Sequence, residues 1–170
     1  LADATELAKY GIKFTAPADD APAILELDGA TIAPTMEQPG RETKSYCYYS
    51  AIYSAACPLR INVKSESSIL VNSFVPKSDK DNVIADIYAN QHPLTISGEK
   101  LNVSADGCNK AMYVYGIYVT GESGYIDGKV FTEAKNTCSG DNTNAVAIMA
   151  SNHLYFHGKA EVTAVVTRTM

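Results

Sequence analysis

A serine flanked by glycines is the first feature of this sequence that could support chemistry. The segment Gly121-Glu122-Ser123-Gly124 is similar to the surroundings of a protease serine. A serine nucleophile also needs a base within hydrogen-bonding reach and donors for an oxyanion. His92 is the only histidine upstream of Ser123, and the residues around it are typical of a loop. Because a turn between two strands explains the glycines, we predict that the chain has no catalytic residue and is not an enzyme.

Two histidines near the carboxyl end are candidate metal ligands. His153 and His157 lie on one face of the expected strand, with Tyr155 between them. On a strand they are too far apart to hold one metal ion, whereas on a helix their spacing of four residues would suit one. Gly158 and the alternating residues after it favour the strand, so we predict no metal site here.

Two clusters of Asp and Asn residues offer the oxygen ligands that calcium prefers. They are Asp79, Asp81 and Asn82, and Asp141, Asn142 and Asn144. The complete EF-hand pattern is absent, and so are the phosphate-loop and dinucleotide motifs. We therefore interpret both clusters as solvated turns and expect no cofactor.

The cysteines bear on the compartment in which the protein folds. Their wide spacing, with no Cys-x-x-Cys pair, does not favour a zinc site. We predict two disulfides, for which three connectivities are possible. We prefer Cys47–Cys57 with Cys108–Cys138, because each bond closes a local loop and contributes about 3 to 3.5 kcal/mol. Disulfides indicate an exported protein, at the cell surface or outside the cell. The alternative is a cytosolic protein with four reduced thiols.

Tyrosines form the most promising binding pattern, with eleven in the chain and no tryptophan. Tyr46, Tyr48, Tyr49 and Tyr53 surround the first cysteine pair, and three more lie in residues 113–118. Tyrosine joins a flat apolar ring to a polar tip, which suits binding surfaces and contacts with sugars. The ordinary interpretation is that most of these rings cover the edges of the sandwich. The alternative, which makes the first cluster a candidate binding site, is a receptor or carbohydrate site built from tyrosines.

The elements that must position these residues are almost all strands. Only residues 4–10 have a helical pattern, which Gly11 ends. From residue 12 onward, apolar residues alternate in short runs, with turn residues about every ten positions. Tight hairpins are predicted at Asp28-Gly29, Ser97-Gly98-Glu99-Lys100 and Asp127-Gly128. We see no internal repeat and no linker.

These elements predict an all-β fold. Spaced turns and alternating runs are typical of two packed antiparallel sheets. In one such run, Leu59, Ile61 and Val63 fall on the same side and are expected to be buried. We predict an antiparallel immunoglobulin-like β-sandwich with a short N-terminal helical segment. It forms a single domain over residues 1–170.

The strand at the carboxyl end has the clearest pattern. Ala160, Val162, Ala164 and Val166 share one face, because side chains alternate along a strand. This apolar face must pack beside another strand, which belongs either to this molecule or to another chain. The sequence leaves both possibilities open, and we predict these residues as an assembly surface.

This terminal segment resembles the carboxyl-terminal strand of chaperone–usher fimbrial subunits. In that family a glycine precedes the alternating apolar positions, and an aromatic residue is penultimate. Here Gly158, thirteenth from the end, precedes the alternation, whereas Thr169 stands at the penultimate position.

The resemblance implies an immunoglobulin-like fold that lacks its last strand and is completed by a neighbour's amino-terminal extension. Residues 1–15 would be that extension or donor segment, with Leu7, Ile12 and Phe14 as the inserted side chains. Like subunits and a periplasmic chaperone would then be the protein partners.

The charge distribution narrows the choice of partners. The formal net charge is -5, and the fourteen Lys and Arg residues form no basic stripe. Phosphate neutralisation dominates nucleic-acid affinity, so we expect no nucleic-acid partner. No run of about 18 apolar residues occurs, so we also expect no membrane insertion.

Three functions are compatible with the sequence. The leading one is a non-catalytic structural or adhesion subunit of a bacterial surface that assembles or binds by strand addition. The second is a secreted binding module, lectin-like or an enzyme inhibitor, that holds a host receptor or glycan on a tyrosine-rich face. The third is a small secreted hydrolase that uses His153, His157 or Ser123.

Overall fold

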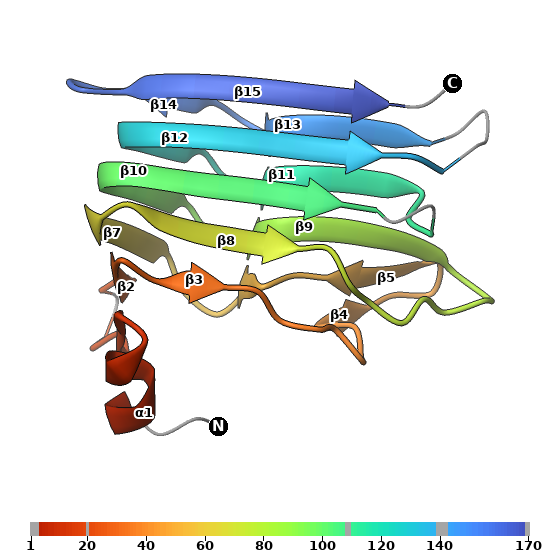
Figure 1. Cartoon of the computed structure of the whole chain (residues 1–170), viewed down its shortest axis with the longest axis horizontal. Coiled ribbons are helices and arrows are strands. Elements are labelled where there is room, and N and C mark those ends of the chain that lie inside the picture. The colour runs from red at the N-terminus through yellow and green to blue at the C-terminus, as the bar shows by residue number, and fades with distance from the viewer. Residues whose placement is uncertain (1–3, 20, 108–109, 139–142, 169–170) are drawn as a thin grey trace.

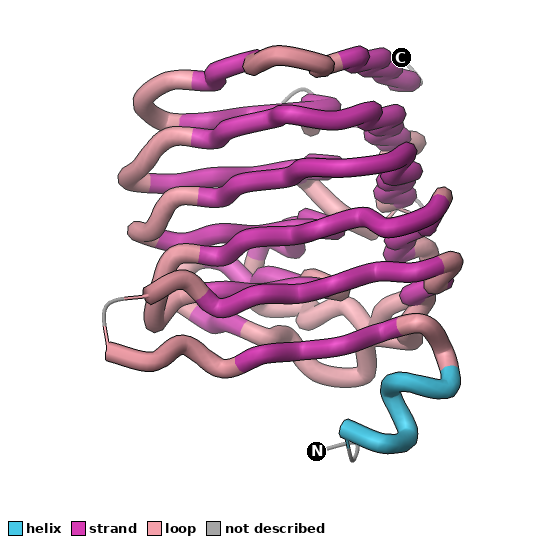
Figure 2. Tube along the Cα trace, turned by 90° about the vertical axis from the view of Figure 1, so that its left-hand side faces the viewer, coloured by secondary structure: helices cyan, strands magenta, loops and turns pink. Residues whose placement is uncertain are grey.

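The chain folds into a stack of flattened β-coils, preceded by one short helix, α1 (Ala4–Lys9) (Figure 1). A computed structural model describes residues 4–19, 21–107, 110–138 and 143–168. The predicted helical segment is confirmed. Each coil contributes strands to two facing sheets, and Figure 2 shows the coils lying one above another.

Two sheets run along the stack. The nine-stranded sheet consists of β1 (Ile12–Thr15), β2 (Ala23–Asp28), β3 (Thr31–Ile32), β7 (Leu59–Ser65), β8 (Ser67–Val71), β10 (Leu94–Asp106), β12 (Gly124–Asn136), β14 (Leu154–Phe156) and β15 (Glu161–Arg168). The six-stranded sheet consists of β4 (Arg41–Glu42), β5 (Tyr46–Tyr49), β6 (Ile52–Ser54), β9 (Asp81–Asn90), β11 (Tyr113–Thr120) and β13 (Asn144–Ala150).

The chain passes from one sheet to the other and returns one coil further along the stack. In parallel register, Leu59 lies beside Leu94. Leu94 in turn lies beside Gly124, which lies beside Leu154. Successive coils are therefore 35, 30 and 30 residues apart at this position. Such stacking of similar units, each in contact with the next, makes the fold a β-solenoid.

The prediction of an all-β fold is confirmed, but the antiparallel immunoglobulin-like β-sandwich is wrong. Among the described strands, only β1 with β2 and β4 with β5 pair antiparallel. Alternation shows which side chains share a face, but it carries no information on the direction of the neighbouring strand. Turns about ten residues apart fit a solenoid equally well, because the chain must also turn wherever it changes sheets.

The three predicted hairpins are wrong for a related reason. Both β10 and β12 continue through their glycines, and β2 is followed by β3 in the same sheet. Gly98 has a φ of +103°, and a Cβ atom there would lie 2.1 Å from the carbonyl oxygen of Val63 in the preceding coil. Glycine is thus required at a bend where one coil closely approaches the next, rather than in a hairpin turn.

Columns of apolar side chains fill the space between the sheets. One column crosses four strands of the nine-stranded sheet and consists of Leu25, Ile61, Ile96 and Ile126. All four side chains are buried, and full burial of each contributes roughly 1.5–3 kcal/mol. The expected burial of Leu59, Ile61 and Val63 on one side of β7 is confirmed.

The two ends of the stack differ. At the amino-terminal end, the antiparallel strands β1 and β4 cover the edges of the two sheets. At the other end, no described residue covers the inward side chains of the last coil. Phe156 and Val166 are therefore 55% and 52% exposed, although they continue buried columns.

Candidate functional site

Tyrosines gather on the outer side of the six-stranded sheet, where the coil repeat aligns them. Tyr53, Tyr88 and Tyr118 are register partners on three adjacent strands. The ring centroids of Tyr53 and Tyr88 are 5.3 Å apart, and those of Tyr88 and Tyr118 are 5.1 Å apart. These distances are typical of favourable aromatic stacking.

A local bend in β11 adds a second ring to this row. Val114 and Ile117 are buried in the interior, and a Cβ atom on Gly116 would lie 2.2 Å from Thr132 Oγ1, also inside the stack. Two successive residues, 116 and 117, therefore face inward, which interrupts the alternation. Tyr115 and Tyr118 consequently emerge on the same side, with ring centroids 4.3 Å apart and planes within 9° of parallel.

Tyrosines of β5 and β11 complete the surface. Tyr48 stacks on Tyr88 at 5.2 Å, and Tyr46 contacts both Tyr48 and Tyr113 at 6.2 and 6.1 Å. We call the resulting surface the tyrosine face. It consists of Tyr46, Tyr48, Tyr53, Tyr113, Tyr115 and Tyr118, together with the central Tyr88, which is only 1% exposed beneath its neighbours.

An open depression of about 210 Å³ lies in the tyrosine face. Its lining residues are Tyr46, Tyr48, Val83, Tyr113, Tyr115 and Tyr118. Burial raises the pKa of Tyr115 to about 12 and also raises the pKa values of Tyr48 and Tyr118. The hydroxyl groups of these three residues therefore stay protonated at neutral pH and can both donate and accept hydrogen bonds.

Arg41 of β4 lies across one side of the tyrosine face. Its guanidinium carbon is 5.2 Å from the ring centroid of Tyr48 and 5.9 Å from that of Tyr88. Its Nη1 donates to the hydroxyl oxygen of Tyr88 and, at 3.1 Å, to Oδ1 of Asn90. Thr120 donates to the same amide oxygen at 3.0 Å. A cation and an amide thus border the aromatic surface.

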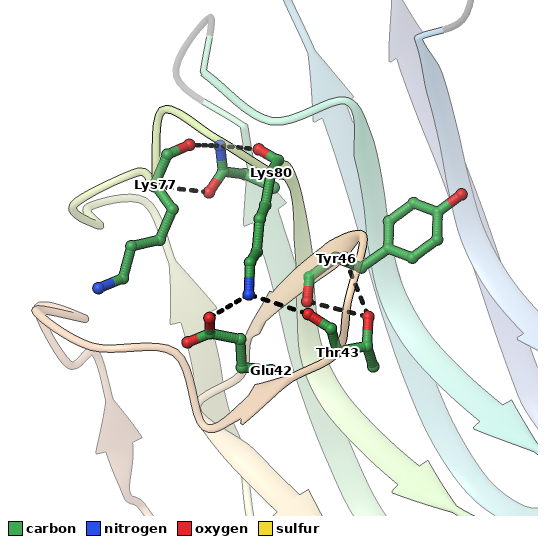
Figure 3. A network of polar contacts seen from close by, with 6 residues as sticks. Glu42, Thr43, Tyr46, Lys77 and Lys80 are labelled. Carbon is green, nitrogen blue, oxygen red and sulfur yellow. Dashed lines mark hydrogen bonds and ion pairs between the residues drawn. The ribbon is translucent and has the colours of Figure 1, made fainter.

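The turn between β4 and β5 holds Tyr46 in position (Figure 3). Lys80 pairs with Glu42 and also donates to the carbonyl oxygen of Thr43 at 3.0 Å. The hydrogen bond to Glu42 raises the pKa of Lys80. Thr43 Oγ1 accepts from the backbone N–H of Tyr46 at 2.9 Å. Fixed turns of this kind reduce the side-chain entropy lost when a ligand binds.

Three of the four predicted tyrosines lie on this surface. Tyr46 and Tyr48 line the depression, and Tyr53 is 37% exposed beside it. Tyr49 instead faces the interior, where its ring packs 4.9 Å from that of Phe74 and its hydroxyl donates to the Val75 carbonyl at 2.7 Å.

No local pattern in the sequence marked Tyr88 or Arg41 as a site residue. The spacings from Tyr53 to Tyr88 and from Tyr88 to Tyr118, 35 and 30 residues, match the coil repeat and could have indicated the row. The coils are 35, 30 and 30 residues long, and this unequal spacing explains why no internal repeat was recognised in the sequence.

Cys47 and Cys57 do not form the predicted disulfide. Cys47 packs in one cluster of the core and Cys57 against another, at opposite ends of the extended segment that contains β5 and β6. An extended chain of this length separates the two Cα atoms far beyond the roughly 6 Å that a disulfide spans. Burial raises the pKa of the Cys47 thiol.

The second predicted pair, Cys108–Cys138, includes Cys108, which lies outside the described residues. The expectation of export thus loses the support of the first disulfide and stays a prediction.

The other residues considered for chemistry are dispersed. Ser123 is buried before β12, and no histidine of the described chain hydrogen-bonds to it. His153 and His157 flank Tyr155 at β14, with ring centroids 5.5 and 6.1 Å from its ring. Within the described ranges, no group of three or more His, Cys, Asp or Glu residues is arranged to hold a metal ion.

The two Asx clusters do not form a common site. The Asn82 side chain closes its turn, accepting from the Lys77 amide at 2.9 Å and donating to the Lys77 carbonyl at 3.0 Å (Figure 3). In the second cluster, Asp141 and Asn142 lie outside the described residues, and Asn144 begins β13.

The predicted assembly residues lie at the open end of the stack. Val162, Ala164 and Val166 of β15 are register partners of Val130, Thr132 and Ala134, all of which are buried in the preceding coil. Ala160 and Val162 pack partly against the main core cluster. The amino-terminal segment proposed as a donor is already paired within the chain, because β1 joins β2.

A second concavity of about 560 Å³ lies at the amino-terminal end. It is lined by apolar side chains of α1, β1 and residues 51–59, together with Ser54 and Tyr53. None of its lining residues carries a charge, so it offers little to orient a ligand. The tyrosine face, which combines rings with polar groups, is the better candidate.

Comparisons with known proteins give no relative: no family model, no curated protein and no solved structure matches this chain. No helix in the described residues is long and apolar enough to cross a membrane. The resemblance to fimbrial subunits stays a prediction, but the immunoglobulin-like fold that it implied is replaced by a solenoid.

Proposed function

We propose that the protein is a non-catalytic binding module that holds sugar rings of a glycan on the tyrosine face. The observation that carries this proposal is the depression of about 210 Å³ lined by five tyrosines. A pyranose ring has a C–H face that packs on an aromatic ring and a rim of hydroxyls that hydrogen-bond. Tyrosine matches both features, since it presents an apolar body and a polar tip.

The rigidity of the surface supports the same function. The tyrosine rings are already stacked on each other, and the turn that carries Tyr46 is fixed by Thr43 and Lys80. Such a surface loses little conformational entropy when it binds, which favours affinity for a weakly apolar ligand. Among the described residues of the nine-stranded sheet, the ring contacts form a smaller group in which Tyr125 stacks on Tyr155 at 5.1 Å, with His153 and His157 beside them.

A glycan array followed by calorimetry tests the proposal. Tyr115→Ala should weaken binding of the best array ligand by about two- to tenfold, because one stacked ring contributes about 0.5–1.5 kcal/mol. Tyr125→Ala is the matched control, since it removes a stacked ring from the other sheet. An array without binding by the folded wild-type protein would refute the proposal. Equal losses in the two variants would exclude the tyrosine face as the site.

Assembly by strand addition is the second candidate, and the open end of the stack favours it. The outer edge of β15 and the exposed Val166 offer backbone groups and an apolar side chain to another strand. If copies associate there, Val166→Lys should lower the mass measured by light scattering. Thr163→Lys, on the outer face of the same strand, should not. A wild-type protein that stays monomeric at high concentration would rule this candidate out.

A further inference from the structure

Arg41 contacts aromatic rings and an amide instead of a carboxylate. Seven lysines each lie within 4 Å of a carboxylate; they are Lys9, Lys13, Lys64, Lys80, Lys100, Lys129 and Lys135. Arg41 is partly buried, yet no carboxylate of the described residues pairs with it. Its hydrogen-bond partners, Tyr88 and Asn90, are neutral and engage only one nitrogen of the guanidinium. The remaining donors are suited to an anion.

The charge of Arg41 lies next to the depression. Its guanidinium stacks over Tyr48, which is one of the lining residues, and the Tyr48 ring in turn stacks on Tyr88. A sugar ring placed on Tyr48 in the depression would have its substituents within reach of Arg41. A carboxylate is the substituent that a guanidinium binds best, because two parallel hydrogen bonds can form.

The opposite side of the surface carries charges of both signs. Asp81 is the register partner of Tyr46, which lines the depression away from Arg41, and Lys80 pairs with Glu42 in the turn beside it. Arg41, by contrast, is a cation that lies over the rings of Tyr48 and Tyr88. It is therefore the group placed to hold an anionic substituent of a sugar stacked on the tyrosines.

We propose that the tyrosine face binds acidic glycans, with the carboxylate of a uronic or sialic acid residue on Arg41 and its ring on the tyrosines. This inference rests on the proposed glycan-binding function and specifies its ligand class. The carboxylate forms no covalent bond: charge-assisted hydrogen bonds to Arg41 hold it, while stacking on the tyrosines holds the ring.

An array of paired probes tests the ligand class. Glucuronate, galacturonate and sialic acid oligosaccharides are printed, each beside its methyl ester, which keeps the ring and removes the charge. The wild-type protein should prefer at least one acid over its ester by about tenfold, the contribution expected of a hydrogen bond to a charged group. The same pair is then titrated by calorimetry.

Three variants locate the preference. Arg41→Gln should abolish the preference for the acid but retain binding of the ester. Arg41→Lys should retain part of the preference for the acid. Lys44→Gln is the control, because it removes the same charge from the exposed turn between β4 and β5. Thermal melting shows that each variant is folded.

The outcomes separate this inference from the function on which it rests. If wild-type protein binds acids and esters equally, or if Arg41→Gln keeps the preference, acidic recognition by Arg41 is wrong while glycan binding stands. If no probe and no neutral glycan binds, the proposed function itself fails. Binding of quaternary ammonium compounds in place of sugars would also overturn both, because tyrosine rings attract cations.

Discussion

The outer faces of the two sheets are built on the same coils but carry different side chains. On the nine-stranded sheet, oppositely charged residues of neighbouring strands pair along the stack. These pairs are Lys64–Glu26, Lys100–Glu66, Lys129–Glu161 and Lys135–Asp106. On the six-stranded sheet, the equivalent ladder consists of tyrosines, with Arg41 beside them.

The difference indicates which face is adapted to a ligand. Solvated ion pairs contribute about 0–1 kcal/mol each, and they keep a sheet surface soluble without any partner. The stacked tyrosines also stabilise cross-strand pairing, but unlike ion pairs they present flat rings, hydroxyl groups and the Arg41 guanidinium to a ligand. The contrast between the faces therefore supports the tyrosine face as the binding surface.

The largest expected effect comes from the bend at Gly116, which brings Tyr115 beside Tyr118. In Gly116→Ala the new Cβ would lie 2.2 Å from Thr132 Oγ1 and 2.7 Å from the Ala147 carbonyl oxygen. We expect a loss of about 1–3 kcal/mol in the free energy of unfolding, measured by urea denaturation, together with weaker ligand binding.

Gly40→Ala is the matched control, because the nearest atom to its Cβ would be 4.0 Å away. Unchanged stability and unchanged binding in Gly116→Ala would mean that the bend does not shape the tyrosine face.

The second-largest effect is expected from Asp86, which lies in the interior between the two sheets. Asp86 is fully buried, its Oδ1 accepts from the Val71 amide at 2.9 Å, and its Oδ2 has no hydrogen-bond partner among the described residues. Burial raises the pKa of Asp86 well above its usual value, while the Val71 and Ser104 amides lower it by less. At a pH above that usual value, the Asp86 carboxyl is ionised in the unfolded chain but still protonated in the folded protein. The free energy of unfolding therefore falls as the pH rises toward the folded-state pKa.

Asp86→Asn should remove this pH dependence. The variant should be more stable than wild type at pH 7, by on the order of 1–2 kcal/mol, and nearly equal to it near pH 4. Melting temperatures of both proteins between pH 4 and pH 8 measure the difference. Ligand binding should be unchanged, because Asp86 lies inside the stack. Parallel melting curves for the two proteins at every pH would contradict the expectation.

The smallest effect is expected on the charged face. Lys100 pairs with Glu66 at 2.9 Å, and both side chains are about half exposed. Lys100→Ala should shift the melting temperature by no more than about 2 °C, and less at high salt, because exposed ion pairs are screened. Glycan binding should stay at the wild-type level. A marked loss of binding would show that the nine-stranded face takes part and would break the contrast.

The sequence was informative about strands and faces but not about strand direction. Alternation in residues 59–64 correctly predicted the buried side of β7, because burial depends only on the local period of two. Parallel pairing depends on residues some 30 positions apart, and no local pattern reports it. The glycines at Gly98 and Gly128 were taken for hairpin turns, since a bend between coils needs the same residue type.

The candidate site was only partly predictable, because the sequence shows local clusters but not the pairing between coils. The cluster from Tyr46 to Tyr53 is local in sequence, and it predicted an aromatic surface that three of its tyrosines now form with other strands. Tyr49 could not be separated from its neighbours without knowing the side of the strand that faces the core. Arg41 and Tyr88 are brought to the cluster only by pairing between coils.

The most direct measurement of the central claim is a titration of the protein, labelled with ¹³C in its tyrosine rings, with the best array glycan. Resonances of Tyr48, Tyr115 and Tyr118 should shift progressively with ligand, while those of Tyr125 and Tyr155 on the other sheet stay in place. Saturable shifts confined to Tyr125 and Tyr155, or no shift of any ring at saturating ligand, would contradict the assignment of the tyrosine face as the binding site.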